Sequence, residues 1–181
     1  QIRHCCIVCL NSGMFIIASI NYLFGQTETE HFIYEDIETN YIRIKPKGEI
    51  NSVLTKGYAT LWVEEKAKST YIKYILKPFQ ELIDEGVFSS ERMKELKQKD
   101  EKIRIELYLD ETGIVSYVSF VFRKEKGTLL TDEELYQIHQ KYRKVVFDIA
   151  ETPFRKSEDG GTPTSFYSGE SFWIPFKDLK Y

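Results

Sequence analysis

Two alternating segments joined by a short turn are the feature that most constrains how this chain can fold. In residues 102–109 apolar side chains alternate with polar ones, which predicts a strand with one buried face and one solvated face. Residues 114–122 are apolar on both faces, so we expect them to form the more central strand of the pair. Between them, Gly113 can adopt the positive φ that a tight turn requires. The two segments therefore predict an antiparallel hairpin.

A helix and a last strand are predicted after the hairpin. Thr131 and Glu134 have the spacing of a capping box, in which each side chain bonds a backbone amide at the helix start. Residues 171–176 form a further strand, and Pro175, which has no N–H, predicts that its end lies at a sheet edge. Apolar residues at helical spacing predict a helix over 132–149 that packs across the hairpin through one stripe: Leu135, Ile138, Tyr142, Val145, Val146 and Ile149. The order of elements predicts an α+β fold, an antiparallel sheet with helices packed on one face.

Residues 26–100 are expected to contain strands and helices that lead into this unit. Residues 26–39 are acidic, and we expect a loose start there. The alternating segment 41–45 stops at Pro46, which predicts a short edge strand. Residues 53–63 are rich in β-branched and aromatic side chains and predict another strand, with a bulge or a close backbone approach at Gly57.

Helical spacing returns in residues 72–83, where Pro78 interrupts the pattern. An interior proline lacks a hydrogen-bond donor and clashes with the preceding turn. Either the helix kinks at Pro78, or a second helix begins with this proline in its first turn. Gly86 is expected to end the helix, and Ser89 to cap the next one.

The first 25 residues have the composition of an export signal. A short polar start precedes apolar residues, and no acidic residue occurs before Glu28. This predicts a signal peptide over residues 1–25, with the mature chain beginning near Gln26. Residues 22–27 resemble Gram-negative export signals, although Leu23 stands where a small residue is usual. An uncleaved membrane anchor and a buried core element are the alternatives. We expect an exported protein of the periplasm or cell envelope.

Composition excludes several classes of function. The net charge of −3 and the interleaving of Lys with Glu give no electrostatic footprint for nucleic acid. All three cysteines, Cys5, Cys6 and Cys9, lie near the start. The chain from Gln26 onward therefore has no disulfide, no thiol nucleophile and no thiolate metal site.

The histidines suggest no catalytic site. His4 lies in the expected signal peptide, His31 in the acidic stretch, and His139 at the border of the apolar stripe. Catalytic and metal-binding histidines need partners at set spacings, and His139 has none nearby in the sequence. A partly buried, structural His139 is the simpler interpretation. We expect no enzyme activity, no cofactor and no metal site.

Aromatic side chains gather late in the chain. Phe166, Tyr167, Phe172 and Trp173 lie within eight positions of one another. Core and strand packing is one interpretation. The other is a partner-binding surface, because aromatic residues are enriched at binding hot spots.

The C-terminal elements together resemble the C-terminal domain of TonB-type energy transducers. The resemblance covers residues 102–177 and divides the mature chain into a lead-in, 26–100, and a TonB C-terminal-like unit, 101–181. The matching positions are Asp110 and Gly113 in the turn, Asp132 to Glu134 at the helix start, Pro153 and Phe154, Gly160 and Gly161, and Ile174 to Phe176. Full-length members of that family also have an uncleaved membrane helix and a proline-rich spacer, whereas this chain has only 5 Pro.

The resemblance implies a non-enzymatic interaction module. Such a module would bind a protein or an extended peptide by sheet-edge pairing. Its partner would be an outer-membrane receptor or another envelope protein. The alternative is an exported α+β scaffold or small-ligand-binding domain.

Overall fold

The computed structural model describes residues 27–49, 62–63, 68–110, 112–148, 150, 154–155 and 168–180. Within them, one antiparallel sheet of six strands has the order β1-β2-β3-β6-β5-β8. These strands are β1 (Thr27–Glu28), β2 (Phe32–Glu38), β3 (Tyr41–Pro46), β5 (Lys102–Leu109), β6 (Val115–Arg123) and β8 (Ser168–Pro175). A separate pair consists of β4 (Trp62–Val63) and β7 (Phe154–Arg155).

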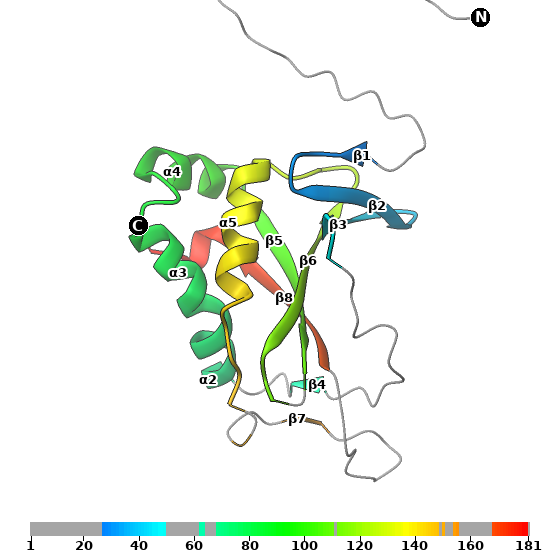
Figure 1. The fold of residues 1–181 in the computed structure, drawn as a ribbon. Coiled ribbons are helices and arrows are strands. Elements are labelled where there is room, and N and C mark those ends of the chain that lie inside the picture. The colour runs from blue at the N-terminus through cyan, green and yellow to red at the C-terminus, as the bar shows by residue number, and fades with distance from the viewer. Residues whose placement is uncertain are drawn as a thin grey trace, which may run out of the picture.

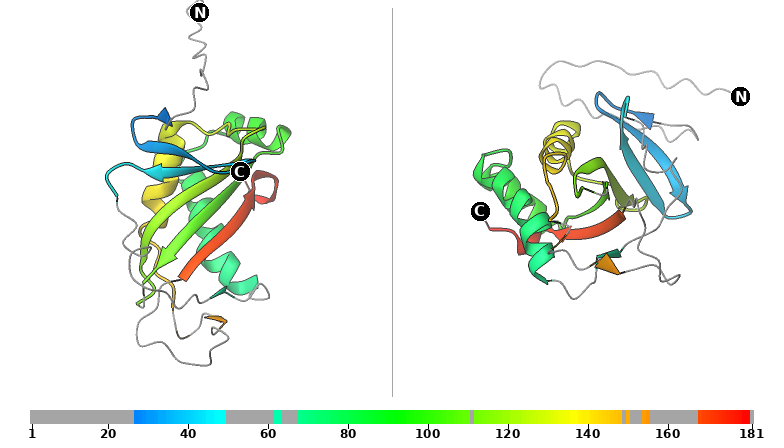
Figure 2. Two further views of the ribbon diagram at one scale, coloured as in Figure 1. Left: turned by 90° about the vertical axis from the view of Figure 1, so that its right-hand side faces the viewer. Right: turned by 60° about the horizontal axis from the view of Figure 1, so that its bottom comes forward.

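The helices lie against one face of the six-stranded sheet (Figures 1 and 2). They are α2 (Lys68–Tyr71), the π-helix η1 (Ile72–Leu76), α3 (Lys77–Asp84), α4 (Ser90–Gln98) and α5 (Asp132–Tyr142), and a 3-10 turn, η2 (Phe176–Asp178), follows β8. The predicted fold class, an antiparallel sheet with helices on one face, is confirmed.

The predicted hairpin is present. Strands β5 and β6 pair antiparallel, with Leu107 opposite Val118. Gly113 has a φ of 84°, the positive value that its turn requires. Strand β6 lies between β3 and β5 and is the more central of the two, as predicted.

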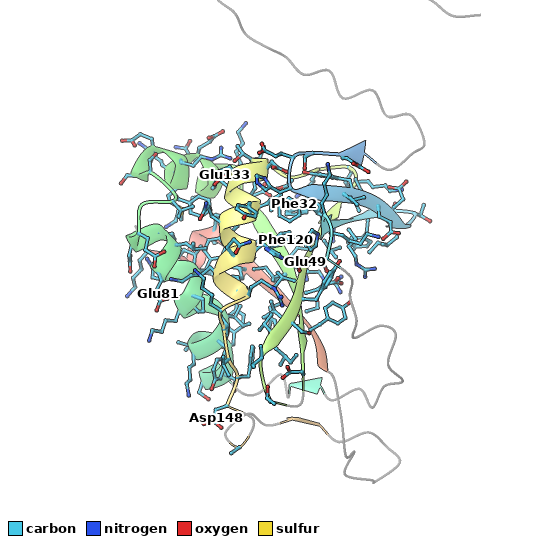
Figure 3. All side chains as sticks on the ribbon, in the orientation of Figure 1. Phe32, Glu49, Glu81, Phe120, Glu133 and Asp148 are labelled. Carbon is cyan, nitrogen blue, oxygen red and sulfur yellow. The ribbon has the colours of Figure 1, made fainter. Side chains whose placement is uncertain are left out.

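The core lies between the sheet and the helices. Alternate residues of β5, from Ile103 to Leu109, are fully buried, and so are Leu135 and Ile138 of α5. Phe32 of β2 contacts Phe120 of β6 edge to face, with ring centroids 5.8 Å apart, and both lie beside α5 in Figure 3. Burying each such side chain contributes roughly 1.5–3 kcal/mol to folding. The predicted packing of the helix on the hairpin is confirmed at Leu135 and Ile138.

The capping box at the start of α5 is confirmed, but the helix ends at Tyr142 instead of Ile149. The next residues pair with the start of β6. The carbonyl of Val145 accepts from the Val115 amide at 3.3 Å, and Val146 forms a bridge with Ile114. Val145 and Val146 fit the spacing of a helix but can also lie in an extended segment. Their pairing with the start of the sheet strand favours the extended segment over the helix. Val146 is 56% exposed, so its assignment to the buried stripe was wrong.

The lead-in shares its sheet with the C-terminal unit, because β3 pairs with β6. The prediction of an edge strand at residues 41–45 was therefore wrong, since β3 lies between β2 and β6. Pro46 is accommodated because it stands at the end of the strand. Residues 27–38 contain β1 and all of β2, where a loose start was expected. Of the strand predicted over 53–63, the described residues are Trp62 and Val63, and Gly57 lies outside them.

Pro78 is preceded by a wide helical turn, not by a break. The amide of Lys77 donates to the carbonyl of Ile72, five residues earlier, as in a π-helix. Pro78 then lies in the first turn of α3, where its missing N–H costs little. The buried hydroxyl of Tyr142 donates to the Ile75 carbonyl at 2.6 Å and supplies this turn with a donor from α5.

The predicted end of α3 and the predicted start of α4 are also confirmed. Ser89 accepts a hydrogen bond from the Arg92 amide, and Gly86 has a φ of 80° after α3. The Arg92 guanidinium donates to Glu134 at 2.7 and 3.0 Å and so joins α4 to α5.

Candidate functional site

The β8 edge, the side of Ser168–Pro175 that faces away from β5, is the candidate functional site. Strand β8 is the last strand of the six-stranded sheet. The Phe176 amide donates to the Glu101 carbonyl of the neighbouring chain segment. Because antiparallel strands direct backbone groups to each side alternately, the amides and carbonyls of Gly169, Ser171 and Trp173 point away from β5. Pro175 falls in the same alternation, so its missing N–H breaks no bond to β5, as predicted for an edge.

The two aromatic residues of β8 point to opposite faces of the sheet. Phe172 is half-buried on the helix side, where its ring lies 6.3 Å from that of Tyr71. Trp173 lies on the opposite face, here called the outer face, and is 43% exposed. Of the two, Trp173 is therefore the side chain available to a partner, a choice that the sequence left open.

Arg104 of β5 lies on the outer face and reaches over β8. It stands directly opposite Trp173 in the register of β5 and β8. Its Nε donates to the hydroxyl of Ser171, so the guanidinium lies over β8. A positive charge and an exposed indole are thus next to each other beside the outward-pointing amide of Ser171.

A partly buried ion pair stabilises the outer face next to this site. The Glu106 carboxylate accepts from Arg43 Nε and from the Ser119 hydroxyl, both at 2.9 Å. Burial lowers the pKa of Arg43, but its hydrogen bond to Glu106 and the charge of Glu106 outweigh this and raise the pKa overall. Glu106 is only 7% exposed, and its partners satisfy it as buried charges require. These side chains hold β3, β6 and β5 together on the outer face.

Tyr71 limits the β8 edge at one end. Its hydroxyl donates to the Trp173 carbonyl at 2.7 Å. Burial raises the pKa of Tyr71, and the charge of Asp178 adds to this, so the hydroxyl keeps its proton. Strand β4 lies next to β8, although the two are not paired in the sheets of the described residues. The Trp173 carbonyl on the β8 edge is therefore already occupied by Tyr71.

The structure describes two of the four aromatic residues predicted as a binding surface. Phe172 and Trp173 lie on β8, whereas Phe166 and Tyr167 lie outside the described residues. Sequence reasoning missed Arg104 and Tyr71. Arg104 appeared as one polar residue of an alternating strand, and only the strand register puts it opposite Trp173. Tyr71 precedes the helical pattern and carried no signal at all.

His139 is buried more deeply than its position at the border of the stripe predicted. It is 2% exposed, and both ring nitrogens lack a hydrogen-bond partner among the described residues. Its Nε2 lies 3.3 Å from a Glu49 carboxylate oxygen, outside hydrogen-bonding orientation, and Figure 3 shows Glu49 beside α5. Burial lowers the pKa of His139 more than Glu49 raises it. The described residues bring no nucleophile to this imidazole.

No protein-family model matches this chain, and no curated protein matches it. A crystal structure of a DUF5043 family protein from Bacteroides uniformis is similar, with a TM-score of 0.49 and 15% identity over 83% of this chain and 84% of that chain. Among the described residues, no helix has both the length and the apolar character needed to span a membrane.

Proposed function

We propose that this chain is an exported, non-enzymatic interaction module that binds an extended segment of a partner protein by pairing with the β8 edge. The observation that carries the proposal is the terminal position of β8 in the sheet, with backbone groups at Gly169, Ser171 and Trp173 directed outward. An unpaired strand edge is a template for another strand. Main-chain hydrogen bonds would provide affinity, and neighbouring side chains would provide selectivity.

The outer face offers that selectivity. Side chains of an added strand alternate between the two faces, so every second one would lie beside Trp173 and Ser171. Trp173 presents an exposed apolar surface of the kind enriched at hot spots. Arg104, held at Ser171, offers a positive charge to the same side chains.

The groups at the Trp173 end of β8 limit how far a partner strand can pair. The Trp173 carbonyl already accepts from Tyr71, and Pro175 has no amide to donate. A partner strand would pair with Gly169, Ser171 and the amide of Trp173 and would end there. The resemblance to TonB C-terminal domains supports an outer-membrane receptor or another envelope protein as the partner.

The alternative function is an exported scaffold or a small-ligand carrier. The buried network of Arg43, Glu106 and Ser119 is compatible with a rigid framework that presents no binding edge. The two functions differ in where a ligand would perturb the protein. A scaffold would show no response to peptides at β8.

The test is a titration of the folded protein with extended peptides from candidate receptors, followed by backbone NMR. We expect shifts concentrated at residues 168–173 and at Arg104. Ser171→Pro should abolish binding, because it removes an outward amide without removing a bond to β5. Ser171→Ala is the matched control, since it keeps the amide and loses only the hydroxyl.

Trp173→Ala should weaken peptide binding while leaving the fold intact, because this side chain is largely exposed. Two results would refute the proposal. One is the absence of shifts at β8 at millimolar peptide. The other is peptide binding by folded Ser171→Pro with unchanged affinity, which would exclude strand addition.

A further inference from the structure

Three metal-ligating side chains from distant parts of the chain meet at one corner of the fold. Glu30 and His31 lie between β1 and β2, and Asp132 is the first residue of α5. One potential ligand atom from each lies within 4.8 Å of the others. The corner is distinct from the β8 edge, because β1 and β8 are at opposite ends of the sheet.

The surrounding residues orient these ligands. The Thr29 hydroxyl donates to Oδ1 of Asp132, which leaves Oδ2 directed at His31. The His31 ring stacks on Tyr136 with centroids 4.0 Å apart, and this contact fixes the plane of the imidazole. Metal ligands in proteins are held in the same way by hydrogen-bonded and packed neighbours.

The corner carries negative charge that its neighbours do not neutralise. Nearby, Glu28 pairs with Lys47, and Glu134 pairs with Arg92. Within the described residues, neither Glu30 nor Asp132 is paired with a lysine or an arginine. A cation would therefore find two carboxylates and an imidazole in one place.

We propose that Glu30, His31 and Asp132 bind one divalent transition-metal ion of the zinc type. Imidazole together with carboxylate favours zinc, nickel or copper, whereas magnesium and calcium prefer all-oxygen sites. Three protein ligands leave at least one coordination position for water. The three residues are partly exposed or exposed, so the ion can enter from solvent.

The ion would take the place of a hydrogen bond. His31 Nδ1 and Asp132 Oδ2 are 2.5 Å apart and share this bond in the structure. Zinc–nitrogen and zinc–oxygen bonds are each about 2.0–2.2 Å long, so the two atoms must separate slightly to admit the ion. The nitrogen that binds the metal carries no proton, and a neutral imidazole meets this condition with its proton on Nε2. The bound ion then joins the β1–β2 turn to α5, two segments 101 residues apart.

The test uses the full chain with Cys5, Cys6 and Cys9 replaced by serine, so that thiolates do not compete for the metal. Zinc is titrated by calorimetry and, in parallel, by backbone NMR. We expect shifts at residues 29–32 and 132–136. Melting temperature should rise with zinc because the ion binds the folded state.

Two variants and one control make the result specific. His31→Ala should abolish zinc binding. Glu30→Gln should weaken it at least about tenfold, the loss that even an outer neighbour of a metal site causes. Glu30 is exposed, so this variant remains informative if His31→Ala fails to fold. The control is Glu133→Gln, a neighbouring exposed carboxylate outside the group of three.

Three outcomes would overturn the proposal. The first is the absence of shifts at both segments at millimolar zinc. The second is equal weakening by Glu30→Gln and Glu133→Gln, which would mean diffuse attraction of a counter-ion. The third is equal affinity for zinc and calcium, which would exclude a role for the imidazole.

Discussion

Removing the hydroxyl of Tyr142 tests how much its hydrogen bond from α5 stabilises the π-helical turn before Pro78. Tyr142 is fully buried, and its hydroxyl donates to the Ile75 carbonyl at 2.6 Å. Tyr142→Phe keeps the ring and its packing but leaves a carbonyl in the core with one partner fewer. Burial raises the pKa of Tyr142 well above its ordinary value, so the native hydroxyl is protonated and able to donate.

The expected loss of stability follows from that single bond. Losing one buried hydrogen bond costs about 0.5–1.5 kcal/mol. For a protein of this size, each kcal/mol lowers the melting temperature by roughly 2–4 °C. Tyr142→Ala would also leave a cavity and should cost about 3–5 kcal/mol. The difference between the two variants separates the hydrogen bond from the packing of the ring.

The assay is urea denaturation followed by far-UV circular dichroism, with the melting temperature as a second measure. Tyr136→Phe is the control, because Tyr136 lies on the same helix and its hydroxyl has no hydrogen bond among the described residues. This variant should change the free energy of unfolding by less than about 0.5 kcal/mol. Two results would refute a stabilising role for the Tyr142 hydroxyl. One is equal stability of Tyr142→Phe and the native protein, and the other is an equal loss of stability in Tyr142→Phe and Tyr136→Phe.

Further predictions concern the helix ends and pH. Val145→Asp should lower the free energy of unfolding by about 2 kcal/mol or more, because Val145 packs against the core. Val146→Asp, at a 56% exposed site, should change the free energy of unfolding by less than about 0.5 kcal/mol. Urea denaturation measures both variants, and an equal effect would contradict the observed end of α5. Burial lowers the pKa of His139 in the folded state below its ordinary 6.5, so the unfolded state binds the proton first and stability should fall as pH drops below about 6.5. Denaturation between pH 8 and 5 should show a smaller fall for His139→Gln than for the native protein, and parallel curves would exclude this role. Thr131→Ala should cost about 1 kcal/mol by removing the cap of α5, and Thr131→Ser should restore most of it; a melting temperature unchanged by Thr131→Ala would argue against the cap.

Local signals in the sequence predicted the elements whose geometry depends on neighbours along the chain. The turn at Gly113, the cap at Thr131 and the cap at Ser89 were all identified from residue types and spacing. Each depends on hydrogen bonds or backbone angles within a few residues. The alternation of β5 likewise followed from one buried and one solvated face.

Elements that depend on distant pairing were not predictable in this way. Pro46 at the end of β3 predicted an edge strand, but β3 pairs on both sides. Val146 fitted a helical stripe, yet it lies in an extended segment beside Ile114. In both cases the local pattern was present in the sequence, but contacts with β6 determined the observed structure.

The sequence by itself determined the composition of the core, the hairpin, the helix caps and the class of fold, because these follow from periodicity and local hydrogen bonding. Only the tertiary structure decided that Trp173, not Phe172, is exposed on the β8 edge, and that Arg104 reaches the same place. It also brought His31, apparently isolated in an acidic stretch, to Asp132. The physical reason is that strand register and helix docking bring together residues 67 and 101 positions apart, and no local pattern encodes contacts over such distances.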